Sequence, residues 1–410
     1  MTGGTSQEGA QKVRGQNLVW ALTAGHMAVH WFQQLWPVVI ASIRQDLALS
    51  NVQLGTVSSV KQFTTGPLTL PAGIVADFFR NRTALILGLA VAAFGVSYGL
   101  VSRAPTYLWL LAAVSLLGIG TALWHPAATA SISRRYPDRR GSALAIHNTG
   151  ASIADTISPI VIGALVGLLG WRTTLGLQIF PGLIIGFALW RGLDAVYRNQ
   201  EAGRPALRMY LKDVGGLLKH RVVLAIVGVN SCTSMASVAT LTFLPVYLRE
   251  DLHYSPFILG VHIALLYAMG GLSQPMLGRW SDRFGRKAVL LPSLVLFGFL
   301  YLFLSRAAPG IQLGVVIAGM GLFFYALATV VQATVFDVAS ERVQASSQGI
   351  TGLLGQIVTL PSPIIAGIIV NHFGLKAVFV YSGCIVLFGA VLLAVIRVPR
   401  IARPTPRALG

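Results

Sequence analysis

Charged residues are what this sequence has least of. Only 11% of its 410 residues are Asp, Glu, Lys or Arg, and 54% are hydrophobic, whereas a soluble domain carries about 25% charged residues. The shortage extends over the whole length of the chain. We therefore expect an all-α membrane protein whose solvent is the lipid bilayer.

Acidic residues and cysteine are also scarce. There are 13 acidic residues against 31 basic ones, which gives a net charge of +18. Lys and Arg fall in short clusters between apolar segments, as in cytoplasmic loops of membrane proteins, and no basic face with interleaved aromatics indicates a nucleic-acid partner. The two cysteines, Cys232 and Cys384, both lie in apolar runs, which excludes a disulfide framework or a cysteine metal site.

Sequence signatures of catalysis are missing as well. No Ser-His-Asp set, glycine-rich phosphate loop or metal-ligand cluster stands out. An ATP-driven pump would need a Walker-type loop, which the chain does not contain. We expect neither an enzyme nor a bound cofactor.

Long apolar segments dominate what is present. A membrane-spanning helix needs about 20 mainly apolar residues, and twelve segments meet this requirement. Their expected limits are 17–43, 52–76, 83–103, 107–133, 142–170, 173–193, 222–248, 256–279, 287–306, 310–336, 346–371 and 375–397. If both termini are cytoplasmic, the basic clusters all fall in cytoplasmic loops, as the positive-inside rule requires. We therefore expect this orientation in the inner (plasma) membrane.

The twelve segments form two halves. Gly73-Ile-Val-Ala-Asp77 recurs as Gly278-Arg-Trp-Ser-Asp282, and Ser158-Pro159-x3-Gly163 recurs as Ser362-Pro363-x3-Gly367. A repeat of half the chain indicates duplicated bundles that rock around a midplane site. The expected organisation is a cytoplasmic tail (1–16), a six-helix bundle (17–193), a cytoplasmic linker (194–221), a second six-helix bundle (222–397) and a cytoplasmic tail (398–410).

The second copy of the first repeat resembles the loop motif G-x-x-x-D-R-x-G-R-K of the major facilitator superfamily. The matching residues are Gly278, Asp282, Arg283, Gly285, Arg286 and Lys287, and the first copy keeps Gly73 and Asp77. The resemblance covers the whole chain and implies a monomeric secondary transporter of the major facilitator fold. It also implies that these residues latch the two halves together on the cytoplasmic side.

A narrower resemblance is to the fosmidomycin-resistance branch, whose members export drugs or organic anions. Its matching segments are Gly25-His26 followed by Pro37, Trp124-His125-Pro126, Arg139-Arg140-Gly141, Asn148-x-Gly150 and Ser158-Pro159. The sequence departs from the branch at His30, where an acidic residue is usual, and at Asp155, where a small one is usual.

Ionisable residues within the spans are the candidate site, because burying them in a bilayer is costly and they usually face a cavity. Lys61 is the expected anion-binding group, and Asp155 is either a proton carrier or a partner that neutralises Lys61. His26 and His30 share a helix face and can exchange protons near neutral pH. No third ligand at metal spacing accompanies them, so we expect no metal site. His125 beside Pro126 is expected to line the cavity, or else to cap the broken helix.

Neutral polar residues complete the candidate set in the second half. The expected substrate-binding residues are Lys61, His125, His30, His26, Asn230, Gln356 and Tyr325, and the expected proton-coupling residues are Asp155 and His30. These residues predict a proton-coupled antiporter that exports an organic anion or drug-like acid. The alternatives are a proton symporter that imports an organic acid and a non-transporting membrane sensor on the same fold.

Overall fold

The computed structural model describes residues 4–201, 221–338 and 344–396, and its regular structure in these ranges is helical. The first group of helices is α1 (Gly4–Asp46), α2 (Asn51–Phe78), α3 (Thr83–Ser102), α4 (Tyr107–Arg135), α5 (Arg140–Leu177) and α6 (Ile179–Tyr197). The second group is α8 (Arg221–Val246), α9 (Pro256–Phe284), α10 (Arg286–Leu304), α11 (Ile311–Phe324), α12 (Ala326–Val338), α13 (Gln344–Thr359), α14 (Ser362–Phe373) and α15 (Ala377–Val395). Short helical turns are η1 (Arg80–Arg82), η2 (Pro137–Arg139) and η3 (Tyr247–Asp251).

Ten helical stretches in the described ranges are long and apolar enough to cross a membrane. Helices α1 and α2 are outside the ten. In α2 this follows from Lys61 and the Ser, Thr and Gln residues around it, which lower the mean hydropathy. Most of the observed helix ends agree with the expected segments to within a few residues, although α1 begins well before residue 17. Helix α5 continues to Leu177, but its backbone is non-helical at Gly170 (φ 75°, ψ 160°), where the expected segments 142–170 and 173–193 meet.

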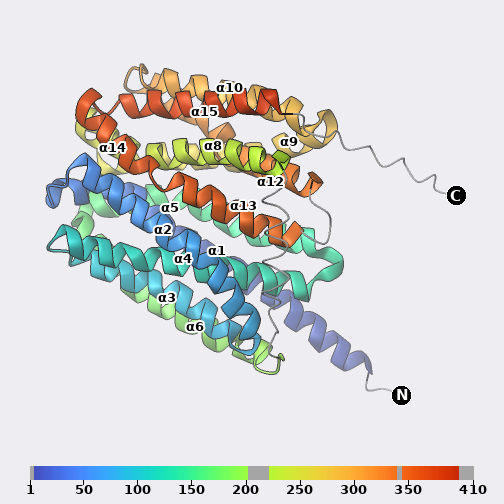
Figure 1. The fold of residues 1–410 in the computed structure, drawn as a ribbon. Helices are drawn as coiled ribbons and strands as arrows, with labels where there is room; N and C mark the ends of the chain where they lie inside the picture. The colour runs from blue at the N-terminus through green and yellow to red at the C-terminus, as the bar shows by residue number, and fades with distance from the viewer. Residues whose placement is uncertain (1–3, 202–220, 339–343, 397–410) are drawn as a thin grey trace.

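Two expected spans are interrupted helices. Tyr325 separates α11 from α12, and residues 360–361 separate α13 from α14. Pro361 and Pro363 explain the second break, because proline has no N–H to donate and its ring clashes with the preceding turn. Both interruptions lie in the second group of helices, and the bend between α13 and α14 is visible in Figure 1.

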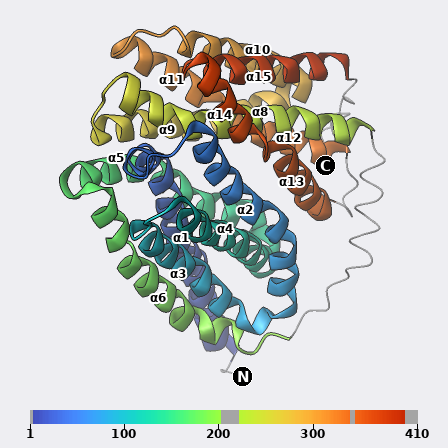
Figure 2. The same ribbon diagram turned by 60° about the vertical axis from the view of Figure 1, so that its left-hand side comes forward.

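The two groups of helices lie side by side in both views (Figures 1 and 2). Helices α1–α6 form one group and α8–α15 the other, and they meet chiefly where α5 packs on α9 and α2 packs on α14. The chain turns back after each expected span, with α11–α12 and α13–α14 each counted as one, so the connections gather at two ends. The seam end holds connections 47–50, 247–255 and 374–376, and the motif end holds 79–82, 136–139 and Gly285.

Four glycines let the two groups touch through their backbones. A Cβ atom added to Gly55 would lie 2.2 Å from the carbonyl oxygen of Pro363. One added to Gly260 would lie 2.1 Å from the carbonyl oxygen of Pro159. A Cβ atom added to Gly163 or Gly367 would lie 2.4 Å from the carbonyl oxygen of Pro256 or Asn51, respectively. We call these four residues the glycine seam. The repeated Ser-Pro-x3-Gly sequence therefore supplies both a proline carbonyl and a glycine to it.

Polar side chains join the two groups at the same end. Arg44 pairs with Glu250 and donates to the side-chain oxygen of Asn51 at 2.9 Å. Asn51 in turn donates to the side-chain oxygen of Asn371 at 2.8 Å. The structure is therefore closed at the seam end.

Gly285 links α9 to α10 with φ of +101°. This conformation is costly for any residue with a Cβ atom, by about 1–3 kcal/mol. We expect Gly285→Ala to lower the apparent melting temperature in detergent, measured by intrinsic fluorescence. Gly278→Ala is the matched control, because Gly278 is inside α9 with open space around it and alanine is the better helix former. Equal melting temperatures for the two variants would contradict the expectation.

Candidate functional site

Three histidines from two helices meet within the first group. His26 and His30 are one turn apart on α1, and His125 comes from α4. Their ring centroids are 4.7 Å (His26–His30), 5.4 Å (His26–His125) and 6.0 Å (His30–His125) apart, and each pair of rings is nearly perpendicular. Each ring offers a nitrogen, and these nitrogens lie within 4.8 Å of one another. We call His26, His30 and His125 the histidine cluster.

Two glycines explain why the helices approach so closely. A Cβ atom on Gly25 would lie 2.3 Å from the indole of Trp124, and one on Gly150 would lie 2.4 Å from the carbonyl oxygen of Thr23. The missing side chain of Gly25 therefore lets α4 pack closely on α1, and that of Gly150 lets α5 pack closely on α1. The resemblance to the exporter branch includes both glycines, and here they position the cluster.

His147 of α5 holds the ring of His26. The two rings are parallel, with centroids 4.0 Å apart, and the His26 Nδ1 atom lies 3.1 Å from the backbone oxygen of His147. Since a carbonyl only accepts, Nδ1 of His26 is the donor and carries the proton. The Nε2 atom of His26 is then a lone-pair acceptor. It is buried and has no hydrogen-bond partner among the described residues.

Asp155 binds the second histidine of α1. One of its carboxylate oxygens accepts hydrogen bonds from Nδ1 of His30 at 2.9 Å and from Nε2 of Gln34 at 2.7 Å. The Asp155 side chain is only 8% exposed. The carboxylate expected to carry protons is thus joined to the histidine expected to act with it.

Two tyrosines of the second group reach the same carboxylate. Tyr267 of α9 and Tyr325 of the α11–α12 break have ring centroids 5.2 Å apart. Both phenols interact electrostatically with Asp155, and Tyr267 also reaches Gln34. Asp155 therefore lies at the junction of the two groups, where a rigid-body movement would change its surroundings.

Lys61 is separate from this network. It lies on α2 with Thr65 and Thr69 following at four-residue spacing, and Thr65 donates to the Lys61 carbonyl at 2.9 Å. No carboxylate of the described residues lies within 4.0 Å of its ammonium. The Lys61–Asp155 ion pair considered from the sequence is not formed in this structure.

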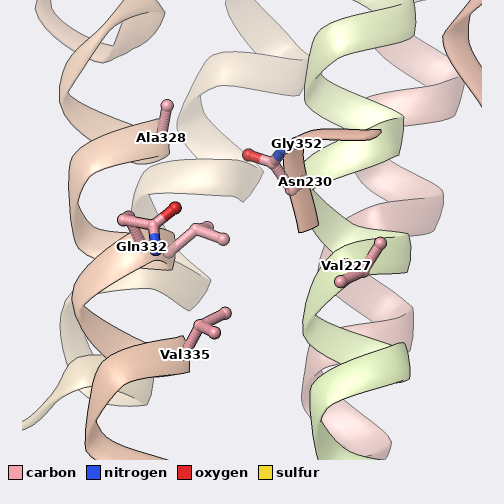
Figure 3. A pocket seen from close by; sticks show the side chains of 7 residues that line it. Val227, Asn230, Ala328, Gln332, Val335 and Gly352 are labelled. Carbon is pink, nitrogen blue, oxygen red and sulfur yellow. The ribbon is translucent and has the colours of Figure 1, made fainter. Parts of the chain in front are cut away.

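The remaining candidates are dispersed over the second group. Asn230 of α8 faces Gln332 of α12 across a cavity of about 60 Å³ (Figure 3). Gln356 of α13 packs instead on α2, where a Cβ atom on Gly66 would lie 2.2 Å from its Oε1 atom. Of the three neutral candidates, only Tyr325 reaches the Asp155 network.

The motif residues pair within each group of helices. Asp77 accepts from Arg134 of α4 at 3.1 Å. Arg286 binds both Asp282 and Asp337, the latter at 2.7 Å, and Lys287 donates to two carbonyls at the end of α15, those of residues 394 and 396. Arg283 lies over the ring of Phe284. In this conformation the motif braces each group internally.

Several contributors were not in the sequence-based set. Three further residues contact the sequence-based candidates: Gln34, His147 and Tyr267. Each lies on a helix that carries a candidate or a motif residue. Gln34 and His147 were identifiable only as polar residues in apolar surroundings. Tyr267 gave no signal, because a tyrosine in an apolar helix is common.

Comparisons with known proteins give the family context. A family model described as Major Facilitator Superfamily matches residues 20–272 and 226–409. The chain is 30% identical over 289 residues to the probable nitrate/nitrite antiporter NarK1 of Thermus thermophilus, a match that spans 67% of this chain and less than two thirds, 62%, of that protein. It is 24% identical over 394 residues to the probable galactarate/D-glucarate transporter GudP of Bacillus subtilis strain 168, covering 87% of this chain and 84% of that one.

Solved structures show the same fold. The nucleoside transporter NupG superposes with a TM-score of 0.74, covering 92% of this chain and 98% of that one, at 14% sequence identity. At such identity the likeness concerns the fold alone.

Proposed function

Because the chain belongs to the Major Facilitator Superfamily, and is therefore a membrane transporter rather than an enzyme, we propose that it is a proton-coupled antiporter that exports an organic anion. Asp155 with His30 carries the proton, and Lys61 with His125 binds the substrate. The observation that carries the proposal is the Asp155 network, in which a nearly buried carboxylate is bonded to His30 and lies against two tyrosines of the other group.

The transport cycle follows from the position of this network. A buried carboxylate is costly unless it is paired or protonated, so its protonation state changes the stability of the arrangement around it. When one group rocks against the other, Asp155 exchanges its tyrosine neighbours for water. Proton release on one side and uptake on the other then couple the gradient to alternating access.

The proposed topology has twelve spans, with α1 and α2 added to the ten apolar stretches. The groups α1–α6 and α8–α15 are the two bundles, with boundaries at 17–193 and 222–397. With both termini cytoplasmic in the inner membrane, the seam end is extracytoplasmic and closed, and the motif end faces the cytoplasm. This orientation places the basic loops inside, in accord with the positive-inside rule.

An anionic substrate is supported by Lys61, which has no carboxylate partner in the described part of the chain, and by the names of two relatives, which concern nitrate, nitrite and sugar acids. The second candidate function is proton symport of an organic acid into the cell, favoured by the long match to a galactarate/D-glucarate transporter. Proteoliposomes with a set pH gradient distinguish the two. Antiport predicts proton movement opposite to the anion, and symport predicts movement in the same direction.

Lys61→Gln is expected to weaken the apparent affinity for the transported anion about tenfold or more. A hydrogen bond to a charged group contributes about 1.5–3 kcal/mol, and each 1.4 kcal/mol is a factor of ten. The KM of anion flux in proteoliposomes measures this effect. Lys376→Gln, a lysine in the 374–376 connection, is the matched control and should leave KM unchanged. An unaltered KM in Lys61→Gln would remove Lys61 from the substrate site.

A further inference from the structure

We propose that the histidine cluster is a binding site for a divalent first-row transition-metal ion such as Zn²⁺. His26, His30 and His125 supply three nitrogen ligands, and Asp155 and His147 position two of them. The site shares His30 with the proposed proton path and His125 with the proposed substrate site. Its effect on transport therefore rests on the proposed function, whereas metal binding itself does not.

The spacing of the three nitrogens suits a metal ion. They lie within 4.8 Å of one another, while ligands 2.0–2.1 Å from a tetrahedral Zn²⁺ are about 3.4 Å apart. Small side-chain rotations close that difference. The nearly perpendicular rings favour this arrangement, because the nitrogen edges can converge on one point without the rings stacking.

The hydrogen bonds of two histidines fix the nitrogen that faces the ion. Nδ1 of His26 donates to the carbonyl of His147, and Nδ1 of His30 is bonded to the Asp155 carboxylate. In both rings Nε2 is left to bind a ligand. Metal-binding histidines almost always hold their second nitrogen in this way, on a carbonyl or a carboxylate. The buried Nε2 of His26 has no hydrogen-bond partner among the described residues. A metal ion bound there would accept its lone pair.

The ligand chemistry selects the class of ion. Imidazole nitrogens suit Zn²⁺, Cu²⁺ and Ni²⁺, whereas Mg²⁺ and Ca²⁺ prefer oxygen ligands. Three neutral imidazoles also leave a fourth tetrahedral position free, as in catalytic zinc sites. Because the three imidazoles are neutral, a bound divalent ion would keep its positive charge. Its fourth ligand would therefore be water or an anion.

Occupation of the site would hold α1 and α4 together and engage His30. A His30 ring bound to metal cannot accept a further proton, because its Nε2 lone pair is taken. We therefore expect micromolar Zn²⁺ to inhibit proton-coupled transport, and chelation to reverse the inhibition.

The test is Zn²⁺ titration of the full chain, purified in detergent without a polyhistidine tag, by isothermal calorimetry. One saturable site is expected, with no response to Mg²⁺. His26→Ala, His30→Ala and His125→Ala should each lower affinity at least about tenfold, since even loss of a ligand's supporting partner typically costs 10–100-fold. His262→Ala is the matched control, because His262 lies on α9 and its Nδ1 is bonded to its own helix.

A second probe guards against variants that fail to fold. His125→Gln keeps a polar side chain near the Pro126 kink, and Co²⁺ added to the folded protein reports tetrahedral nitrogen coordination by its visible spectrum. The spectrum should be lost in His125→Gln and retained in His262→Ala. Absence of a saturable Zn²⁺ site in the unmodified chain, or binding that survives His125→Gln, would overturn the proposal.

The two proposals fail separately. Proton-coupled anion flux without Zn²⁺ binding would remove the metal site and leave the antiporter. Zn²⁺ binding that depends on the three histidines, with no substrate-dependent proton flux, would leave the metal site and remove the antiporter.

Discussion

Replacing Asp155 by asparagine will abolish anion transport driven by a pH gradient, with a fall of about 100-fold or more. Asparagine keeps an oxygen that can accept from His30 and Gln34, so the packing of α1 against α5 is retained, but it cannot take up a proton. Gradient-driven flux in proteoliposomes, measured with a pH-sensitive dye, gives the size of the effect.

The accompanying measurement separates loss of coupling from loss of folding. Exchange of labelled for unlabelled anion at equal pH on both sides needs no proton movement and should persist in Asp155→Asn. Asp46→Asn is the matched control, because Asp46 pairs with Arg172 at the end of α1 with 43% of its side chain exposed. Normal expression with unchanged gradient-driven flux in Asp155→Asn would remove this residue from the proton path.

The second large effect concerns the glycine seam. Gly163→Leu will prevent closure at the seam end and stop transport, because even the first added carbon would lie 2.4 Å from the carbonyl oxygen of Pro256. Gly167→Leu, one turn further along α5, is the matched control, since nothing lies within 4 Å of its added Cβ atom. Its transport rate should stay close to that of the unmodified chain.

Labelling from outside the membrane tests the mechanism of this loss. A cysteine at Ser58, which is buried on α2 near Gly55, is introduced after Cys232 and Cys384 are replaced. An impermeant maleimide should react slowly with it in the unmodified background and faster in Gly163→Leu. Slow labelling in both backgrounds, together with normal transport by Gly163→Leu, would show that the seam does not open in the cycle.

The sequence was sufficient for features that depend on length and repetition. Long apolar segments predicted where most of the helices lie, since a span must be about 20 residues long whatever its neighbours, but not that two of the segments are broken helices. The repeated Ser-Pro-x3-Gly sequence predicted duplicated halves. It did not reveal that the proline carbonyl of one copy touches Gly260 and that of the other touches Gly55, because backbone contacts leave no pairwise signature in a single sequence.

The sequence could single out candidate site residues, but it could not give their geometry. Scarcity identified His26, His30, His125 and Asp155, because ionisable residues are expensive in a bilayer. Their partners depend on how α4 and α5 pack on α1, and that packing is set by glycines of α1 and α5. Spacing along one helix therefore gave no sign that His125, which lies far beyond His30 in the chain, is beside it in space and could be the third ligand of the proposed metal site.

The glycine seam also bears on how the proposed antiporter would preserve a proton gradient beside a buried acid. A carbonyl oxygen lying so close to a bare α-carbon leaves little room for water between the helices at these four positions, and the proposed antiporter needs such a barrier between the seam end and Asp155. Such contacts contribute only about 0.5–1 kcal/mol each, and small residues are the usual means of bringing membrane helices together. In the proposed transport cycle, a barrier that depends on close fit rather than on strong bonds can open and close again at every turnover.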